Sequence, residues 1–500
     1  MTMPVFKGLV APPVGSAGCA GCAVNAVNAI YAAWTRRAWL GAAAALLVAC
    51  AQGPTAPPPP AAEALPPIVF VHGNGDTAAL WSTTVWRFES HGWPPERLHA
   101  IDMPYPLARD ADDVAQPGRT SAAEHMQFLA DEVDKVLQAT GARQVVLIGN
   151  SRGGNAIRDY IANGASPVGG GAAKVSHAIL GGTPNHGVQA IPDVNPNNEF
   201  NGAGPFLVGL NAPKGPNGNE VTPGVRWMTI RSDNNDKFAQ PDGVWIGRKG
   251  KPTNVTFDGP ALKGADNLML PGRDHREVAY HPEAFAAAYR FVTGRAPAST
   301  NTLHITPEAR VVLNGQVGGY TAAGATNLPL TGAQVAVYAV DPATGARQGA
   351  ALVDKTVGTD GRWGPISTDA KTPLEFVVQA PGFAVTHFYR SAFLRSSDIV
   401  NLRPERLAAA DKDSGAGSDA VVSFTRPRAY FGNPRDSVLI DGDAAPGIPV
   451  GVAGVAASKV KRAAGRPVVG EFRSGVIVER IVGQTWPAKD NHLTVLELQE

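Results

Sequence analysis

The stretch Val145-Val146-Leu147-Ile148-Gly149-Asn150-Ser151-Arg152-Gly153-Gly154 decides the fold. Four apolar residues at its start predict a buried strand, and residues 156–161 just after it predict a helix. A Gly-x-Ser-x-Gly motif between a strand and a helix holds its serine on a sharp turn. Glycine two positions on either side of Ser151 avoids collision with the neighbouring strand and helix. The order therefore predicts a nucleophile elbow with Ser151 at its tip.

The chain around this motif alternates short apolar runs with amphipathic stretches, from residue 68 to about residue 298. A capping box over Ser121–Glu124 predicts the start of a helix that continues to Gly141. The predicted strands are Ile68–Val71, Leu98–Ile101, Val145–Ile148, Ala178–Leu180, Val225–Ile230 and Asn267–Leu270. Strands that alternate with helices in this way indicate an α/β domain with a mostly parallel sheet.

Two further side chains are needed if Ser151 is to act as a nucleophile. A serine hydroxyl is a poor nucleophile at neutral pH, so a base must take its proton and a carboxylate must orient that base. Asp236 and Asp233 both lie in the loop after the predicted strand 225–230, and Asp236 is our first choice. His275 lies between the next strand and the last helix, where the base is expected.

The transition state of ester hydrolysis carries negative charge on the former carbonyl oxygen, and two N–H donors must stabilise it. Asn74, in His72-Gly73-Asn74 after the first strand, is predicted to supply one donor. The backbone of Arg152, the residue after the nucleophile, is predicted to supply the other. His72 precedes the serine at the tip of the first strand, so we expect a structural hydrogen-bonding role for it.

With these residues in place, the segment 68–295 resembles an α/β-hydrolase of the bacterial lipase and esterase type. His72-Gly73-Asn74 matches the oxyanion segment of that family, residues 149–153 match its elbow, and Asp236 and His275 match the remaining triad members. The resemblance implies a carboxylic-ester hydrolase that uses an acyl-enzyme and needs neither a cofactor nor a metal. It also implies an ester as the substrate.

Two features of the segment depart from that pattern or add to it. Position 152 is Arg where Met or Gln is common, which we expect to affect the preference of the acyl pocket. Residues 183–224 are rich in Asn, Gly and Pro and contain one apolar island, Pro205–Leu210. A loop this long inside a compact domain is usually functional. We interpret it either as a mobile cover over the site or as a surface excursion.

Beyond Pro297 the helical pattern gives way to short alternating segments such as 334–340 and 374–378. Such segments predict the strands of a β-sandwich. Together with Thr359–Gly364 they resemble the transthyretin-like modules appended to many secreted hydrolases. We therefore predict an all-β, transthyretin-like sandwich over 303–404 and a further β subdomain over 419–500. This layout is similar to that of two-domain lipases, in which the appendage assists the binding of long acyl substrates.

Length, charge and cysteine content narrow the class of protein. A chain of 500 residues corresponds to roughly three domains at about 150 residues each. The formal net charge of +1 argues against a polybasic nucleic-acid binder, so no nucleic-acid partner is expected. Cys19, Cys22 and Cys50 are the three cysteines, so the chain after residue 50 can contain neither a disulfide framework nor a cysteine-based zinc site.

The first 67 residues are typical of an export signal followed by a tether. The apolar run Ala38–Val48 has 11 residues, too few to span a hydrocarbon core that needs about 20. Residues 35–40 resemble a twin-arginine signal, and Leu47–Cys50 resembles a lipoprotein cleavage site. We expect a signal peptide over 1–50, a lipid on Cys50 that anchors the chain in the cell envelope, in the outer membrane or periplasm, and a Pro-rich linker over 51–67. A secreted protein is the alternative.

The sequence thus predicts an exported serine esterase or lipase. A polyester depolymerase, of the type that acts on polyhydroxyalkanoate, uses the same chemistry and is an alternative. A second alternative is a non-catalytic cell-surface binding protein on the same scaffold. An acyltransferase or amidase would also use this site, because the chemistry depends on which acceptor takes the acyl group.

Overall fold

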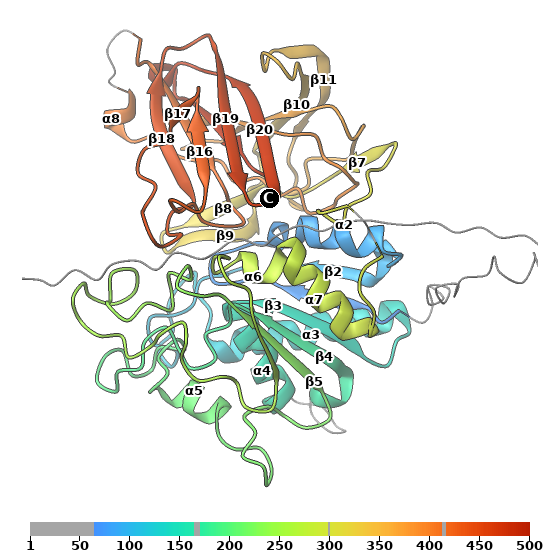
Figure 1. Cartoon of the computed structure of the whole chain (residues 1–500). Coiled ribbons are helices and arrows are strands. Elements are labelled where there is room, and N and C mark those ends of the chain that lie inside the picture. Colours follow the sequence, from blue (N-terminus) through green and yellow to red (C-terminus); the bar gives the residue numbers. More distant parts are fainter. Residues whose placement is uncertain (1–64, 165–170, 299–300, 413–416) are drawn as a thin grey trace, which may run out of the picture. The chain divides into compact units, whose positions relative to one another are not determined.

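The computed structural model describes residues 65–164, 171–298, 301–412 and 417–500 (Figure 1). The predicted signal peptide over 1–50, with Cys50, lies outside the described residues, as do residues 51–64 of the predicted linker. In the described ranges no helix is long and apolar enough to cross a membrane.

The N-terminal half of the described chain, which we call the catalytic half because the sequence predicts the active site there, is built on a six-stranded parallel sheet with the strand order β2-β1-β3-β4-β5-β6. Short apolar runs form these strands because both faces of a parallel sheet are covered by helices. The strands are β1 (Ile68–Val71), β2 (Leu98–Ile101), β3 (Val145–Asn150), β4 (Val175–Gly181), β5 (Arg226–Arg231) and β6 (Asp266–Met269). The predicted strands are therefore present, with ends that differ by at most three residues.

Helices cover both faces of this sheet and divide its core into two apolar layers. On one face Phe70 of β1 packs against Phe88 of α2, which in turn meets Phe285 of α7. On the other face Val69 and Val71 pack with buried residues of α3 and α4. The helices are α2 (Ser82–Ser90), α3 (Ala122–Thr140), α4 (Arg152–Asn163), α5 (Pro205–Leu210), α6 (Glu277–Tyr280) and α7 (Pro282–Thr293).

The capping signals of α3 and the apolar island of the insert take the expected local form. The Ser121 side chain accepts from the Glu124 backbone N–H, the Glu124 side chain accepts from the Ser121 backbone N–H, and Gly141 ends the helix in the left-handed conformation. The island forms α5, and Arg158 on α4 holds it by donating to the Leu210 carbonyl at 3.1 Å. The movement of 183–224 as a cover stays a prediction.

The C-terminal half is mostly β. Within the described residues it contains a seven-stranded sheet, β11-β10-β13-β14-β21-β15-β18, a four-stranded sheet, β17-β16-β19-β20, and two two-stranded sheets. The bounds are β7 (Val311–Leu313), β8 (Gly318–Thr321), β9 (Gly324–Pro329), β10 (Gln334–Val340), β11 (Arg347–Thr356), β12 (Ile366–Thr368), β13 (Leu374–Gln379), β14 (Val385–Arg390), α8 (Ala409–Lys412), β15 (Ala420–Thr425), β16 (Ser437–Ile440), β17 (Asp443–Ala444), β18 (Ala457–Arg462), β19 (Pro467–Ser474), β20 (Ile477–Gln484) and β21 (His492–Glu497).

One sheet crosses the boundary that the sequence suggested between 303–404 and 419–500. Strand β21 lies between β14 and β15 and pairs with both in parallel. Three strands from the second segment thus continue the sheet that the first segment begins. Periodicity along the chain marks each strand but carries no signal for this pairing, because register between distant strands depends on the assembled fold.

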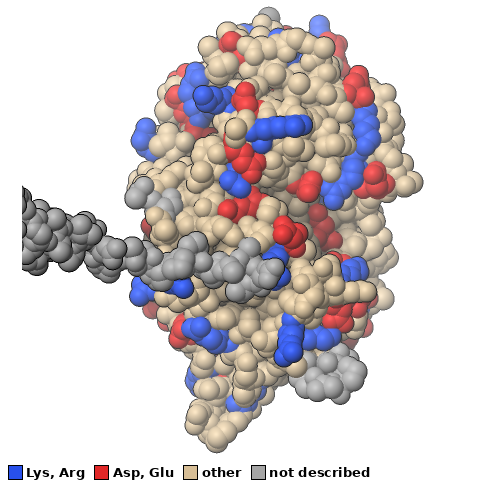
Figure 2. Space-filling model, turned by 90° about the vertical axis from the view of Figure 1, so that its right-hand side faces the viewer, with Lys and Arg blue, Asp and Glu red and all other residues tan. Residues whose placement is uncertain are grey.

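The surface view in Figure 2 shows Lys and Arg interspersed with Asp and Glu over the face that it displays. Interspersed charges of this kind are typical of a solvated surface and produce no extended field of one sign. The near-neutral composition is therefore matched by the charge distribution on this face.

Candidate active site

Ser151 occupies the sharp turn between β3 and α4. Its backbone has φ 52° and ψ −120°, a conformation that non-glycine residues adopt rarely. The Ser151 backbone N–H donates to the Gly181 carbonyl at 3.0 Å, which ties the turn to the end of β4. A residue held in such a conformation is typical of catalytic turns, where the surrounding structure fixes the strain.

The two glycines of the motif make this turn possible, as the sequence predicted. A Cβ at Gly153 would lie 2.4 Å from the Val71 carbonyl oxygen and 2.6 Å from that of His72. A Cβ at Gly149 would lie 2.7 Å from the Ile157 side chain. Helix α4 therefore approaches the end of β1 so closely that only a hydrogen fits at position 153.

His275 and Asp236 form a buried pair in the loops that follow β6 and β5. The Nδ1 atom of His275 lies 2.9 Å and 3.0 Å from the two carboxylate oxygens of Asp236. Only 4% of His275 and 8% of Asp236 is exposed, so the pair is largely shielded from water. The Phe238 ring packs edge-on against the imidazole with ring centroids 4.5 Å apart. This geometry can fix both the orientation and the tautomer of the histidine.

Asp233, the second choice for the acid, performs a different task. Its carboxylate accepts from the Gly272 backbone N–H at 2.8 Å and from the Asn235 backbone N–H at 3.0 Å. Burial acts to raise the pKa of Asp233, but these hydrogen bonds outweigh it and hold the pKa below its usual value. Of the two acids left open, the structure thus places Asp236 against His275 and Asp233 against the backbone of the histidine loop.

Ser151 lies at the same edge of the sheet as this pair, because β3, β5 and β6 are parallel and all three residues follow carboxyl ends of strands. The Asn150 side chain links the two sides directly by donating to the His275 carbonyl at 3.1 Å and to the Gly181 carbonyl at 3.0 Å. Among the described residues no hydrogen bond joins the Ser151 hydroxyl to the His275 ring. Such bonds often tighten only when substrate is bound.

The predicted oxyanion donors flank the serine. A Cβ at Gly73 would lie 3.1 Å from the Ser151 Cβ, so the turn after β1 approaches the nucleophile closely. The Asn74 side chain accepts from the Ala108 backbone N–H at 2.8 Å and thereby fixes this turn. The backbone N–H of Arg152 stands at the first position of α4, where a helix has no internal acceptor to offer. Arg152 therefore borders Ser151 in the chain, and Gly73, the residue before Asn74, borders it in space.

His72 has the structural role that the sequence suggested. Its ring is buried, and Nε2 accepts from the Met103 backbone N–H at 3.1 Å. Burial lowers the pKa of His72, which favours the neutral ring that this acceptor role requires. The side chain of Asn327, in β9, donates to the Met103 carbonyl at 2.9 Å and to the Asp76 carbonyl at 2.9 Å. Nothing in the local sequence around Asn327 pointed to this contact with the catalytic half.

The Arg152 side chain is buried inside the protein and bonded there. Its guanidinium pairs with Glu199 of the 183–224 insert at 2.5 Å and donates to the Thr120 carbonyl at 2.8 Å. Burial raises the pKa of Glu199 to about 7, although the Arg152 charge opposes the shift. In the structure the Arg152 side chain anchors the insert to the elbow, and its effect on the preference of the acyl pocket stays a prediction.

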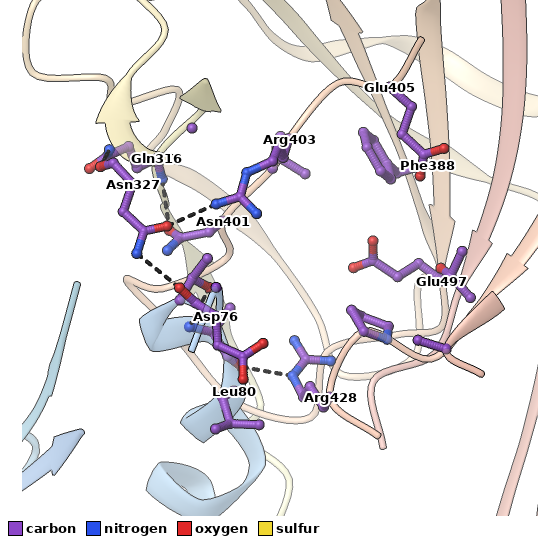
Figure 3. Close-up of a pocket in the computed structure, with 18 of the residues that line it drawn as sticks. Asp76, Leu80, Gln316, Asn327, Phe388, Asn401, Arg403, Glu405, Arg428 and Glu497 are labelled. Carbon is purple, nitrogen blue, oxygen red and sulfur yellow. Dashed lines mark hydrogen bonds between the residues drawn. The ribbon is translucent and has the colours of Figure 1, made fainter. Parts of the chain in front are cut away.

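Two cavities border the site. A cavity of about 170 Å³ is lined by Asp236, Phe238 and His275 together with residues of the insert. A second cavity, of about 510 Å³, lies between the turn after β1 and the C-terminal half. Figure 3 shows Asp76 and Leu80 on one side of the second cavity, and Phe388, Glu405 and Glu497 on the other. In the described ranges no group of three or more His, Cys, Asp or Glu side chains is arranged to hold a metal ion.

The fold and these residues define an α/β-hydrolase with a serine elbow. Two family models match the chain: "Lipase (class 2)" over residues 66–199 and "Lipase C-terminal domain" over residues 309–407. The chain thus contains a segment that matches a class 2 lipase domain, followed by a segment that matches a lipase C-terminal domain. Ser151 lies within the first match, whereas Asp236 and His275 lie beyond it.

Individual relatives are distant. The non-heme chloroperoxidase of Burkholderia pyrrocinia is 27% identical over 139 residues, which is 28% of this chain and 42% of that protein. The lipase BlEst2 of Bacillus licheniformis in its mature form matches 48% of this chain and 95% of its own at 19% identity and a TM-score of 0.32. Lipase B of Aspergillus fumigatus matches 47% of this chain and 54% of its own at 17% identity and a TM-score of 0.31. The chain therefore spans less than half the length of the curated relative it matches.

Proposed function

We propose that the whole protein is a serine carboxylic-ester hydrolase in which Ser151, His275 and Asp236 form the catalytic triad. The observation that carries the proposal is the buried His275–Asp236 pair at the sheet edge where Ser151 occupies its strained turn. An imidazole oriented by a carboxylate, beside a serine that the backbone holds at the tip of an elbow, is the arrangement that acyl transfer needs.

The reaction proceeds through an acyl-enzyme. The Ser151 oxygen attacks the ester carbonyl while Nε2 of His275 takes the hydroxyl proton, and Asp236 stabilises the resulting imidazolium. The backbone N–H groups of Asn74 and Arg152 bind the oxyanion. The intermediate collapses, and the imidazolium returns its proton to the departing alcohol. Water then attacks the acyl-enzyme with His275 as base, and collapse of the second intermediate releases the carboxylic acid and restores Ser151.

The test combines covalent labelling with turnover. We expect a fluorophosphonate probe to label the protein stoichiometrically at Ser151 and p-nitrophenyl butyrate to be hydrolysed. Ser151→Ala should lose the label and at least about 1,000-fold of the turnover while keeping its circular-dichroism spectrum. A folded wild-type protein that neither reacts with the probe nor hydrolyses short, long or polymeric esters would overturn the proposal and favour the non-catalytic binding protein.

We further propose that the protein is exported as a lipoprotein with its lipid on Cys50. The twin-arginine-like residues 35–40 and the small residues before Cys50 support this. Cys50→Ala should abolish incorporation of labelled palmitate and release the protein from the membrane fraction; equal fractionation of both forms would contradict the lipid anchor. The transthyretin-like character of 303–404 is likewise proposed, on its strand pattern and turn sequences.

A further inference from the structure

The loop that carries His275 is attached to the C-terminal half by buried charges. Asp274 and Glu277 flank the histidine, and both are fully buried in the described structure. Each caps the other: the Asp274 backbone N–H donates to the Glu277 carboxylate at 2.8 Å, and the Glu277 backbone N–H donates to that of Asp274 at 3.0 Å. Two carboxylates so close together repel each other unless cations compensate them.

The compensating cations come from the other half of the chain, about 150 residues further along. Arg426, itself fully buried, donates to Glu277 at 2.6 Å and lies 3.5 Å from Asp274. Arg435 donates to the other oxygen of Glu277 at 2.7 Å. The backbone N–H of Tyr430, between these two arginines, donates to Asp274 at 2.8 Å. Both acids of the histidine loop are therefore held by the segment 426–435.

Arg276, in the same loop as His275, also contacts the segment 426–435. Arg276 donates to the Pro427 carbonyl at 3.0 Å and pairs with Asp76, which follows the oxyanion turn. Its guanidinium also lies 4.8 Å from the centre of the Tyr430 ring. The histidine loop, the oxyanion turn and the segment 426–435 thus meet around one arginine.

The loop of the catalytic acid is attached in a similar way. Lys237, next to Asp236, donates to the Gly454 carbonyl at 3.0 Å, and its ammonium lies 3.7 Å from the centre of the Tyr430 ring. A cation this close to an aromatic face is attracted by the ring. The C-terminal half therefore contacts the neighbours of both His275 and Asp236.

The electrostatics of Glu277 agree with this picture. Burial alone would raise the pKa of the Glu277 carboxyl, but the charges of Arg426 and Arg435 outweigh burial and hold the pKa well below its usual range. A carboxylate that stays ionised in a buried place depends on its cations, and removing one of them leaves an uncompensated charge. Without Arg426 the loop would have to open toward water or take up a proton, and either change would displace His275.

We propose that Arg426 and Arg435 are positioning residues of the catalytic site, which fix the histidine loop so that hydrolysis of every ester, including small soluble ones, depends on the C-terminal half. This inference rests on the proposed function. It differs from the expectation that the appendage assists the binding of long acyl substrates, because the contacts made by 426–435 reach the loop of His275.

The experiment compares Arg426→Gln with Arg426→Lys and with a control, Arg347→Gln, in the full chain. Arg347 pairs with the buried Glu375 at 2.6 Å within the seven-stranded sheet, so its loss also removes a cation from a buried carboxylate, which keeps its hydrogen bonds to His387 and Tyr389. Active sites are counted by fluorophosphonate titration, and kcat and KM for p-nitrophenyl acetate are calculated per titrated site. Counting sites removes the effect of misfolded molecules, so a merely structural role would leave kcat per site unchanged.

We expect Arg426→Gln to lower kcat per site by about 10- to 100-fold, because a displacement of roughly 1 Å can cost about 100-fold, while KM changes by less than about twofold. Arg426→Lys should recover part of the loss, and Arg347→Gln should keep kcat per site. Wild-type kcat per site in Arg426→Gln, or an equal loss in Arg347→Gln, would overturn the inference. A wild-type protein without labelling or turnover would instead refute the proposed function.

Arg435→Gln decides the matter if Arg426→Gln does not fold. The Arg435 side chain is 13% exposed, so the protein can hydrate the gap that its loss leaves. We expect the same fall in kcat with little change in KM, and an unaltered kcat per site would overturn the inference equally.

Discussion

Replacement of Asp236 by asparagine isolates the contribution of the proposed triad acid. Both oxygens of Asp236 face Nδ1 of His275, at 2.9 Å and 3.0 Å, and one of them also accepts from the Phe238 backbone N–H at 2.9 Å. In Asp236→Asn the new amide side chain would keep an oxygen toward Phe238 and turn its NH₂ group toward the imidazole. Two donors cannot face each other, so the ring must move its proton to Nε2, where the proton of Ser151 has to go.

This change of tautomer determines the expected magnitude. Loss of the correctly protonated base costs about 10⁴-fold in kcat in serine hydrolases of this design. At about 1.4 kcal/mol for each factor of ten, the activation free energy should rise by about 5.5 kcal/mol. The hydrogen bond to Phe238 is retained, so the free energy of unfolding should change little.

The assay is turnover of p-nitrophenyl butyrate per titrated site, with urea unfolding beside it. Asp233→Asn is the matched control, because Asp233 lies in the same loop and bonds backbone N–H groups of Gly272 and Asn235 rather than His275. It should cost about 1–2 kcal/mol of stability and less than about tenfold in kcat. If Asp236→Asn stays within tenfold of wild type while Asp233→Asn loses several orders of magnitude, the assignment of the acid is wrong.

Three further predictions concern the scaffold. Gly153→Ala should lower the free energy of unfolding by about 3 kcal/mol or more, because the new Cβ would meet two backbone oxygens at the end of β1. Gly209→Ala is the control and should be neutral or stabilising, because a Cβ there has nothing within 4 Å. Equal melting temperatures of the two variants would contradict this prediction. Arg152→Met should cost about 3–5 kcal/mol in urea unfolding by stranding Glu199, and adding Glu199→Leu should recover most of it; an unrecovered loss would show that the pair is not the cause. Burial lowers the pKa of His281 to about 3 from its usual 6.5, so between these values the unfolded chain binds the extra proton and stability falls as the pH falls. His281→Asn keeps a cap for α7. It should flatten the slope of the unfolding free energy against pH by up to about 1.4 kcal/mol per pH unit. An unchanged slope between pH 6.5 and pH 4 would refute this prediction.

The catalytic half was predictable because its information is local. An apolar run, a glycine two positions from a serine and a capping box each specify a strand, a turn or a helix within a few residues, and parallel strands bring their carboxyl ends to one edge. Order along the chain was therefore enough to predict that Ser151, Asp236 and His275 would follow strands of a single sheet.

The contacts that cross between the two halves were not predictable in this way. In the sequence alone, Asp274 and Glu277 look like ordinary charged loop residues, and Arg426 looks like a solvent-exposed arginine beside a proline. Their burial and pairing depend on contacts between residues about 150 positions apart, which the local sequence does not encode. The run of four charged or titratable residues over 274–277 was a usable signal, since so many charges around the proposed catalytic histidine need partners. The place of β21 inside the sheet likewise depends on pairing between distant strands.

The location of β21 constrains the order in which the chain can fold during synthesis. Its residues, 492–497, follow β14 by about 100 residues in the chain, yet they lie between β14 and β15, and residues 498–500 contact Arg428 and Arg426 beside the histidine loop. On a translating ribosome β14 and β15 must wait for this strand, so the sheet cannot close and Arg426 cannot take its final partners until residues 492–500 have been made. The proposed hydrolytic activity would then appear only after residues 492–500 have left the ribosome, and a nascent chain stalled before β21 would be inert.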